Sequence, residues 1–142
     1  MGRSAIISKE PESEEKLGPP MPDVKRVLVA DDSATVTTLL ATALELEGYA
    51  VDTAVNGVEA YEKGITGEFD LVIMDQLMPG LLGLEVIDRW QQEGHVNRVI
   101  MLSGVDDDRT VVSSLDLGAV DFVRKPFHLP ELMARIRQRL LG

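Results

Sequence analysis

Short apolar runs alternate with longer amphipathic stretches from residue 25 to the end of the chain. Runs of β-branched and aliphatic residues bounded by turn residues are typical of strands buried in a parallel sheet. Between these runs, apolar residues recur at the spacing of about 3.6 residues that marks one face of a helix. The pattern predicts five strand–helix units, with strands at residues 27–30, 50–54, 71–74, 99–102 and 122–124.

Capping and turn residues place the ends of the predicted helices. Ser33 and Asn56 are good N-caps for the first two helices, and the acidic run Asp106–Asp108 favours the N-terminus of the fourth. Gly118 ends that helix, and Pro130 fits the first turn of the last one. The predicted apolar faces are, in chain order, Val36, Leu39, Leu40, Ala43 and Leu44; Val58, Tyr61 and Ile65; Leu84 and Ile87; Val111, Val112 and Leu115; and Leu132, Met133, Ile136 and Leu140.

Five consecutive strand–helix units predict an α/β fold. Right-handed crossovers then give a doubly wound, five-stranded parallel sheet with helices on both of its faces. The expected strand order is 2-1-3-4-5, which makes the strands at 27–30 and 71–74 neighbours at a topological switch point. Ligands of such folds bind beyond the carboxyl ends of the strands, so the residues that follow the strands are the candidates for function.

The first 24 residues differ in composition from the rest. They lack aliphatic periodicity, and such a segment buries too little apolar surface to offset the entropy of ordering it. We therefore expect an acidic, proline-containing mobile tail at 1–24 and one domain at 25–142. The prolines and glutamates of the tail are Pro11, Pro19, Pro20 and Pro22, and Glu10, Glu12, Glu14 and Glu15.

Composition excludes several classes of function. The net charge of −10 argues against direct nucleic-acid binding, which needs clustered positive charge. The absence of cysteine excludes disulfides and thiolate chemistry, and no apolar run approaches the roughly 20 residues of a membrane-spanning helix. The expected location is the cytoplasm, without membrane insertion. One basic cluster, Arg135, Arg137 and Arg139, either complements a helix C-terminus or forms a docking patch for a partner.

Four predicted strands end on residues suited to phosphate chemistry. Asp31 and Asp32 follow the first strand, Asp75 the third, Ser103 the fourth and Lys125 the fifth. Each signal alone has an ordinary explanation, because acidic residues and serines cap helices or form turns and a lysine before proline is commonly a solvated loop residue. Their joint placement at one edge of a parallel sheet is what indicates a site.

The expected cluster of three aspartates carries more negative charge than Lys125 can balance. Two carboxylates about 4 Å apart repel by roughly 4 kcal/mol at an effective dielectric near 20, and Lys125 supplies a single positive charge. A hard divalent cation fits the deficit, and oxygen ligands favour Mg²⁺ or Mn²⁺. A zinc site is not expected, because His95 and His128 lie far from the acidic residues in the sequence. A carboxylate beside such a cation can attack phosphorus and form an aspartyl phosphate, with Lys125 and Ser103 sharing the phosphoryl charge.

At this point the chain resembles the receiver domain of two-component response regulators, of the kind that chemotaxis regulators contain. The resemblance covers about residues 25–141. It rests on the acidic pair, on Asp75 with the turn that follows it, and on the two segments that lead to Ser103 and Lys125. These motifs are Asp31-Asp32, Asp75 followed by Met78-Pro79-Gly80, Ser103-Gly104, and Gly118-Ala119 leading through Phe122 to Lys125-Pro126-Phe127.

The resemblance implies a flavodoxin-like fold and roles for individual residues. Asp75 would accept a phosphoryl group from phosphohistidine on a sensor histidine kinase or a histidine phosphotransfer protein. Asp32 and Asp75 would bind Mg²⁺ directly, the main-chain carbonyl of Leu77 would add a ligand, and Asp31 would act mostly through water. Lys125 would pair with the acceptor site, and its bond to the following proline would be cis.

The resemblance also implies a switch. Ser103 would move to bond the phosphoryl group, and Phe122 would turn inward behind it. The motion would reshape the surface formed by the fourth helix, the fifth strand and the fifth helix, and so control a downstream protein or an output domain. The chain ends one helix after Lys125, so we expect either a stand-alone receiver or a piece of a longer regulator.

Two positions depart from the commoner pattern and concern the lifetime of the phosphoryl group. The residues two past the acceptor and two past the Ser/Thr influence attack by water in this family, and here they are the apolar Leu77 and Val105. We therefore expect slow dephosphorylation.

Dimerisation is left open by the sequence. Asp121, Glu131 and Arg135 resemble part of the salt-bridge set through which many receivers of transcription factors pair. Val111 and Val120 stand where that set has a lysine and an acid.

Three other classes of protein share part of this pattern. A haloacid-dehalogenase-type phosphatase also uses a nucleophilic aspartate and Mg²⁺, but it separates its two aspartates by one residue, whereas Asp31 and Asp32 are adjacent. A pseudo-receiver binding module would keep the fold without phosphorylation. A dinucleotide-binding domain would have a glycine-rich fingerprint after its first strand, which this chain lacks. A phosphoacceptor, rather than an enzyme that turns over, is the expected function.

Overall fold

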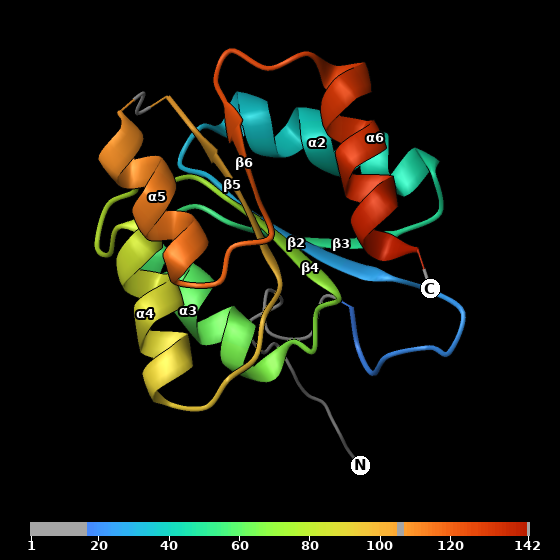
Figure 1. Cartoon of the computed structure of the whole chain (residues 1–142). Helices are drawn as coiled ribbons and strands as arrows, with labels where there is room; N and C mark the ends of the chain where they lie inside the picture. The colour runs from blue at the N-terminus through green and yellow to red at the C-terminus, as the bar shows by residue number, and fades with distance from the viewer. Residues whose placement is uncertain (1–16, 105–106, 142) are drawn as a thin grey trace.

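The computed structural model describes residues 17–104 and 107–141. Strands and helices alternate along this part of the chain, as the sequence predicts (Figure 1). The elements are β2 (Arg26–Ala30), α2 (Ala34–Leu46), β3 (Ala50–Ala54), α3 (Gly57–Thr66), β4 (Leu71–Met74), α4 (Gly83–Gln92), β5 (Val99–Ser103), α5 (Asp108–Asp116), β6 (Asp121–Arg124) and α6 (Leu129–Leu140).

The five strands form one sheet in the order β3-β2-β4-β5-β6, and every neighbouring pair is parallel. This confirms the doubly wound order expected from the sequence. Figure 1 shows α2 and α6 on one face of the sheet and α3, α4 and α5 on the other. Val27 pairs with Leu71 and Ala30 with Met74, so β2 and β4 end at the same level. The residues that follow these two strands are therefore brought side by side.

The apolar core has two parts, one on each face of the sheet. Alternate residues of a strand point to opposite faces, so Val27 and Val29 of β2 belong to one part while Leu28 belongs to the other. The first part contains the buried side chains of α2 and α6, and the second contains those of α3 and α4, among them the buried Trp90. Burial on both faces explains why the central strands read as continuous apolar runs.

The predicted face of α3 is confirmed in part, since Tyr61 and Ile65 pack against the core. Val58 is 43% exposed, whereas Lys63 and Gly64 are buried. A side chain at Gly64 would overlap the indole ring of Trp90, so the two helices approach each other at a glycine. The Lys63 ammonium donates to Asp52 of β3 at 3.0 Å, which balances its buried charge. Glycine and a paired lysine thus share this face with the fully buried Ala60, and the spacing of apolar residues reveals neither of them.

The predicted faces of α2 and α5 are also wrong in part. Leu39 is exposed although its neighbours Leu40 and Leu44 are buried, and on α5 both Val112 and Leu115 are exposed. The residue of α5 that is fully buried is a serine, Ser114. Its hydroxyl donates to the Val111 carbonyl at 2.8 Å, so its burial leaves no unpaired donor. The apolar face of α6 is confirmed.

Helix ends match the predicted caps. The Ser33 and Asp107 side chains accept hydrogen bonds at the N-termini of α2 and α5, while Asp106 lies outside the described residues. Gly118 has a φ of +98°, a left-handed conformation that favours glycine after a helix. Pro130 lies in the first turn of α6.

Replacing Asn56 with alanine is expected to lower the free energy of unfolding by about 1 kcal/mol. The Asn56 side chain accepts from the Glu59 N–H at 2.7 Å, and the Glu59 carboxylate accepts from the Val55 N–H at 2.8 Å. Urea unfolding measures the change. Glu45→Ala is the matched control, since Glu45 is exposed within α2. Equal midpoints for the two variants would contradict the capping role.

The segment before β2 bears on the predicted tail. Residues 17–24 form no helix or strand, and residues 1–16 lie outside the described part of the chain. The mobile tail at 1–24 therefore stays a prediction. No helix within residues 17–104 and 107–141 is long and apolar enough to cross a membrane.

Candidate functional site

Three carboxylates converge where β2 and β4 end. Asp31 and Asp32 follow β2, and Asp75 follows β4. One carboxylate oxygen from each can be chosen so that all three lie within 4.8 Å of one another. Asp31 and Asp75 are buried, whereas Asp32 is exposed and forms the outer side of the cluster. The predicted convergence of the acidic residues is confirmed.

Lys125, which directly follows the edge strand β6, joins this cluster. Its ammonium donates to the Asp31 carboxylate at 2.7 Å and to the Asp75 carboxylate at 3.1 Å. Asp31 and Lys125 are 94 positions apart in the sequence, so only the folded sheet brings them together. The Lys125-Pro126 peptide bond is cis, as the resemblance implies.

Burial and charge set the protonation equilibria of the site. Burial, followed by the nearby charge of Asp31, raises the pKa of Asp75 above its ordinary value of 3.8, and Lys125 offsets only part of this rise. Burial alone would lower the pKa of Lys125, but the hydrogen bond with Asp31 and the charge of Asp75 outweigh it and raise this pKa. Ionising Asp75 is therefore costly, and added positive charge would favour its charged form.

The raised pKa of Asp75 leads to a prediction about stability and pH. Between the unfolded-state pKa and the higher folded-state pKa, the native protein binds more protons than the unfolded chain. The contribution of Asp75 to the free energy of unfolding therefore falls as the pH rises through this interval. Above the interval, the full destabilising effect of the ionised Asp75 is present. Asp75→Asn is expected to remove this contribution and to raise the urea midpoint at neutral pH in EDTA.

The measurement is urea unfolding of both proteins at several pH values, since their difference isolates Asp75 from the other titrating groups. An equal midpoint for parent and variant at every pH would contradict the prediction.

The donor set of the cluster fits a hard divalent cation. All three side chains offer oxygen, and because Asp32 is exposed, water or a phosphoryl oxygen can reach the cluster as a further ligand. Neither His95 nor His128 belongs to the only group of potential metal ligands found among the described residues. Leu77 is 55% exposed, and its N–H makes a long, 3.4 Å contact with the Asp75 carboxylate. Metal ligation by the Leu77 carbonyl stays a prediction.

The two proposed switch residues lie on neighbouring strands. Ser103 ends β5, is fully buried, and accepts from the Lys125 N–H through its main-chain carbonyl at 2.9 Å. Phe122 of β6 is half-buried against the core on the α3–α4 face. The Arg124 guanidinium lies 5.8 Å from the centre of the Phe122 ring. Val105 lies outside the described residues.

Sequence reasoning missed two residues that hold the acceptor loop. Gln76, directly after Asp75, is buried, and its side-chain carbonyl accepts from the Leu84 N–H at 2.8 Å. Its main-chain carbonyl accepts from the Gly83 N–H at 2.9 Å. A Cβ atom at Gly83 would lie 2.5 Å from the Asp75 carbonyl oxygen. The N-terminus of α4 thus packs directly on the acceptor. A glycine at the start of an amphipathic helix was the available signal.

Each arginine of the basic cluster has a partner within the domain. Arg135 pairs with Asp121 at 2.9 Å and with Glu131 at 3.0 Å. The remaining two contacts join α6 to its surroundings: Arg137 pairs with Glu47 at 2.8 Å, and Arg139 donates to the Val120 carbonyl at 2.8 Å. These contacts favour a structural role for the cluster over a docking patch.

Comparison with known proteins identifies the family. The model of the response regulator receiver domain matches residues 27–137. The chain belongs to the response regulator receiver domain family. This receiver domain is 40% identical over 114 residues to the uncharacterized transcriptional regulatory protein YkoG of Bacillus subtilis, covering 80% of the chain and 50% of the relative. It is 39% identical over 113 residues to the alkaline phosphatase synthesis transcriptional regulatory protein PhoP of the same organism, covering 80% and 47%.

Solved structures agree with this assignment. A CheY-like receiver domain protein from Methanospirillum hungatei superposes with a TM-score of 0.78 at 28% identity, covering 83% of this chain and 94% of the other. The response regulator TrrA from Thermotoga maritima, solved in complex with Mg²⁺ and BeF, gives a TM-score of 0.73 at 38% identity, covering 82% and 100%. Receiver domains bind Mg²⁺ at an acidic pocket, and they act with histidine kinases and output domains in two-component systems. The chain spans about half the length of the curated relatives it matches.

Proposed function

We propose that this receiver domain accepts a phosphoryl group on Asp75 from the phosphohistidine of a sensor histidine kinase or a histidine phosphotransfer protein. The observation that carries the proposal is the buried Asp75 carboxylate, held by Lys125 within a cluster of three acidic residues. The protein would act as a phosphoacceptor in the cytoplasm and not as an enzyme that turns over a substrate.

The chemistry follows from the geometry of these groups. A carboxylate oxygen of Asp75 attacks the phosphorus of a phosphohistidine that is protonated on its other ring nitrogen. The bond between phosphorus and nitrogen breaks, its electron pair stays on that nitrogen, and the histidine leaves as neutral imidazole. Lys125 hydrogen-bonds Asp75 and supplies positive charge beside the transferring group. Asp31, Asp32 and Asp75 would hold Mg²⁺, with Mn²⁺ as a substitute, and the Leu77 carbonyl would add a ligand. The metal, when bound, neutralises charge on the phosphoryl oxygens.

The output would pass through the surface of α5, β6 and α6. Ser103 would bond the phosphoryl group, and Phe122 would turn further inward behind it. Val112 and Leu115, exposed on α5, are apolar contacts that a downstream protein or an output domain could cover. Arg135 is paired with Asp121 and Glu131 of its own chain. Sedimentation with and without a phosphoryl mimic measures whether the domain forms a dimer, in which these pairs could form between two chains.

Intact-mass analysis after incubation with acetyl phosphate and Mg²⁺ tests the proposal. The parent protein is expected to gain one phosphoryl group, and Asp75→Asn is expected to gain none. Asp116→Asn, a surface change at the end of α5, is the matched control and should behave as the parent. An equal gain in Asp75→Asn would move the acceptor elsewhere. No gain in the parent would favour a pseudo-receiver, and turnover of a small phosphate ester would favour a phosphatase.

Slow dephosphorylation is expected because Leu77 offers no polar group to orient a water molecule. Leu77→Asn is expected to shorten the lifetime of the aspartyl phosphate about tenfold, the effect of one oriented hydrogen bond worth about 1.4 kcal/mol in the transition state. Loss of the phosphoryl mass over time measures both rates. Leu46→Asn, at an exposed position of α2, is the control. A parental half-life of seconds without a phosphatase would contradict the prediction.

A further inference from the structure

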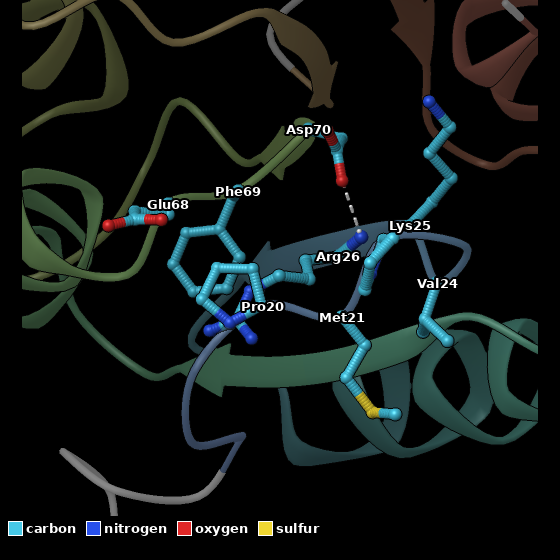
Figure 2. Close-up of a pocket in the computed structure, with 9 residues that line it drawn as sticks. Pro20, Met21, Val24, Lys25, Arg26, Glu68, Phe69 and Asp70 are labelled. Atoms are coloured by element: carbon cyan, nitrogen blue, oxygen red, sulfur yellow. Dashed lines mark hydrogen bonds between the residues drawn. The ribbon is translucent and has the colours of Figure 1, made fainter.

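A pocket lies at the end of the sheet opposite the acidic cluster, where β2 and β4 begin. Its volume is about 530 Å³. Figure 2 shows that it is formed by the segment before β2 together with the start of β2 and the residues before β4. The lining residues are Pro20, Met21, Pro22, Val24, Lys25, Arg26, Glu68, Phe69 and Asp70.

Arg26 is the unusual residue of this pocket. It is only 7% exposed, and its guanidinium makes a single hydrogen bond, from Nη2 to the Gly67 carbonyl at 3.0 Å. Its Nε atom is the only buried side-chain nitrogen or oxygen in the described residues that lacks a hydrogen-bond partner. No carboxylate of the described residues forms an ion pair with it. Burying a cation without a counter-charge has a large desolvation free energy, so an anion bound beside Arg26 would stabilise the folded state.

The two acidic residues of the pocket do not supply that anion. The Asp70 carboxylate accepts from the main-chain N–H of Arg26 at 2.8 Å, as the dashed line in Figure 2 shows. Glu68 has a φ of +55°, and Figure 2 shows its carboxylate directed away from Arg26. Lys25 also lines the pocket, but Figure 2 shows its ammonium directed away from Arg26, so Arg26 is the cation that an anion in the pocket would meet. A guanidinium with free donors is well suited to a carboxylate, which it can bind with two parallel hydrogen bonds.

We propose that this pocket binds a carboxylate supplied by the acidic run Glu10–Glu15 of the same chain. The pocket wall begins at Pro20, five residues after Glu15, and five extended residues span about 17 Å. The run carries Glu10, Glu12, Glu14 and Glu15, and so offers several carboxylates within reach. A short tether also gives these groups an effective concentration of about 1 mM or more, so a weak contact is sufficient. This edge of the sheet is remote from the acceptor site.

Nuclear magnetic resonance of the full chain tests the proposal directly. The side-chain Nε–H of Arg26 gives its own proton–nitrogen signal, which is assigned with Arg26→Lys. A variant with Glu10, Glu12, Glu14 and Glu15 all changed to glutamine is expected to shift this signal, together with the Gly67 and Phe69 amides. Added sodium acetate is then expected to move the signals of the variant back toward their parental positions, while sodium chloride at equal ionic strength does not.

A matched control changes two glutamates that do not line the pocket, Glu45→Gln with Glu62→Gln, and should leave the Arg26 signal unchanged. Identical Arg26 signals in the parent and the four-glutamine variant would overturn the proposal. Acetate shifts of equal size in both proteins would also overturn it, because the pocket would then take a carboxylate from another molecule. If Arg26→Lys fails to fold, assignment through the bonded backbone atoms of Arg26 replaces it.

Discussion

Replacing Lys125 with glutamine is expected to lower the free energy of unfolding of the metal-free protein by about 3 kcal/mol. The Lys125 ammonium is the group that pairs with both Asp31 and Asp75, at 2.7 and 3.1 Å. These carboxylates are buried, and glutamine would leave them close together without a counter-charge. The variant should also lose most of its phosphoryl transfer to Asp75, since the positive charge beside the attacking oxygen is gone.

Urea unfolding in EDTA measures the loss of stability. Repeating the measurement with Mg²⁺ separates the effect of the lost positive charge from the effect of lost side-chain packing. Mg²⁺ is expected to stabilise Lys125→Gln more than the parent, because the cluster then holds one more uncompensated negative charge. Arg137→Gln removes an exposed ion pair with Glu47 and should cost no more than about 1 kcal/mol. A Lys125 variant as stable as this control would show that the pairing contributes little.

Replacing Gly83 with alanine is expected to destabilise the protein by about 2 kcal/mol and to slow phosphoryl transfer. The added methyl group would lie 2.5 Å from the Asp75 carbonyl oxygen and 3.0 Å from the Met101 side chain. Helix α4 would have to move away from the acceptor, which would strain the hydrogen bonds that the Gly83 and Leu84 N–H groups donate to Gln76. The Asp75 carboxylate would then lose its fixed position relative to Lys125.

The rate of mass gain from acetyl phosphate and the urea midpoint are measured together on Gly83→Ala. Gly104→Ala serves as the control for stability, because a Cβ atom there meets nothing within 4 Å. A Gly83 variant with the stability of Gly104→Ala and the parental phosphorylation rate would mean that α4 shifts freely, against the close packing described above.

The strand order and the acidic cluster could be predicted from the sequence because both follow from local signals. Apolar runs such as Leu71–Met74 are buried on two faces and so mark central strands. Parallel strands end at one edge, so the residues after them had to meet there. The pairing of Lys125 with Asp31 and Asp75 follows from charge once the strands are ordered.

Features that depend on neighbours distant in sequence could not be predicted in this way. The burial of Lys63 on α3 depends on its ion pair with Asp52 of β3, and the spacing of apolar residues in α3 does not indicate this pair. Gln76 appears as an ordinary polar loop residue until the N-terminus of α4 is placed against it. No pattern in the sequence singles out Arg26, because the segment before β2 and the residues before β4 enclose it only in the folded domain.

The 94-residue separation of Asp31 and Lys125 has a consequence for when, during synthesis, the proposed acceptor site can form. A ribosome-bound chain from which β6 and the residue after it have not yet emerged lacks the Lys125 ammonium that pairs with Asp31 and Asp75. On the function proposed above, such a chain, or one cut before its last strand, is expected to accept little phosphoryl group at any kinase concentration. Phosphoryl transfer to Asp75 would thereby require that the strand nearest the C-terminus has already folded into the sheet.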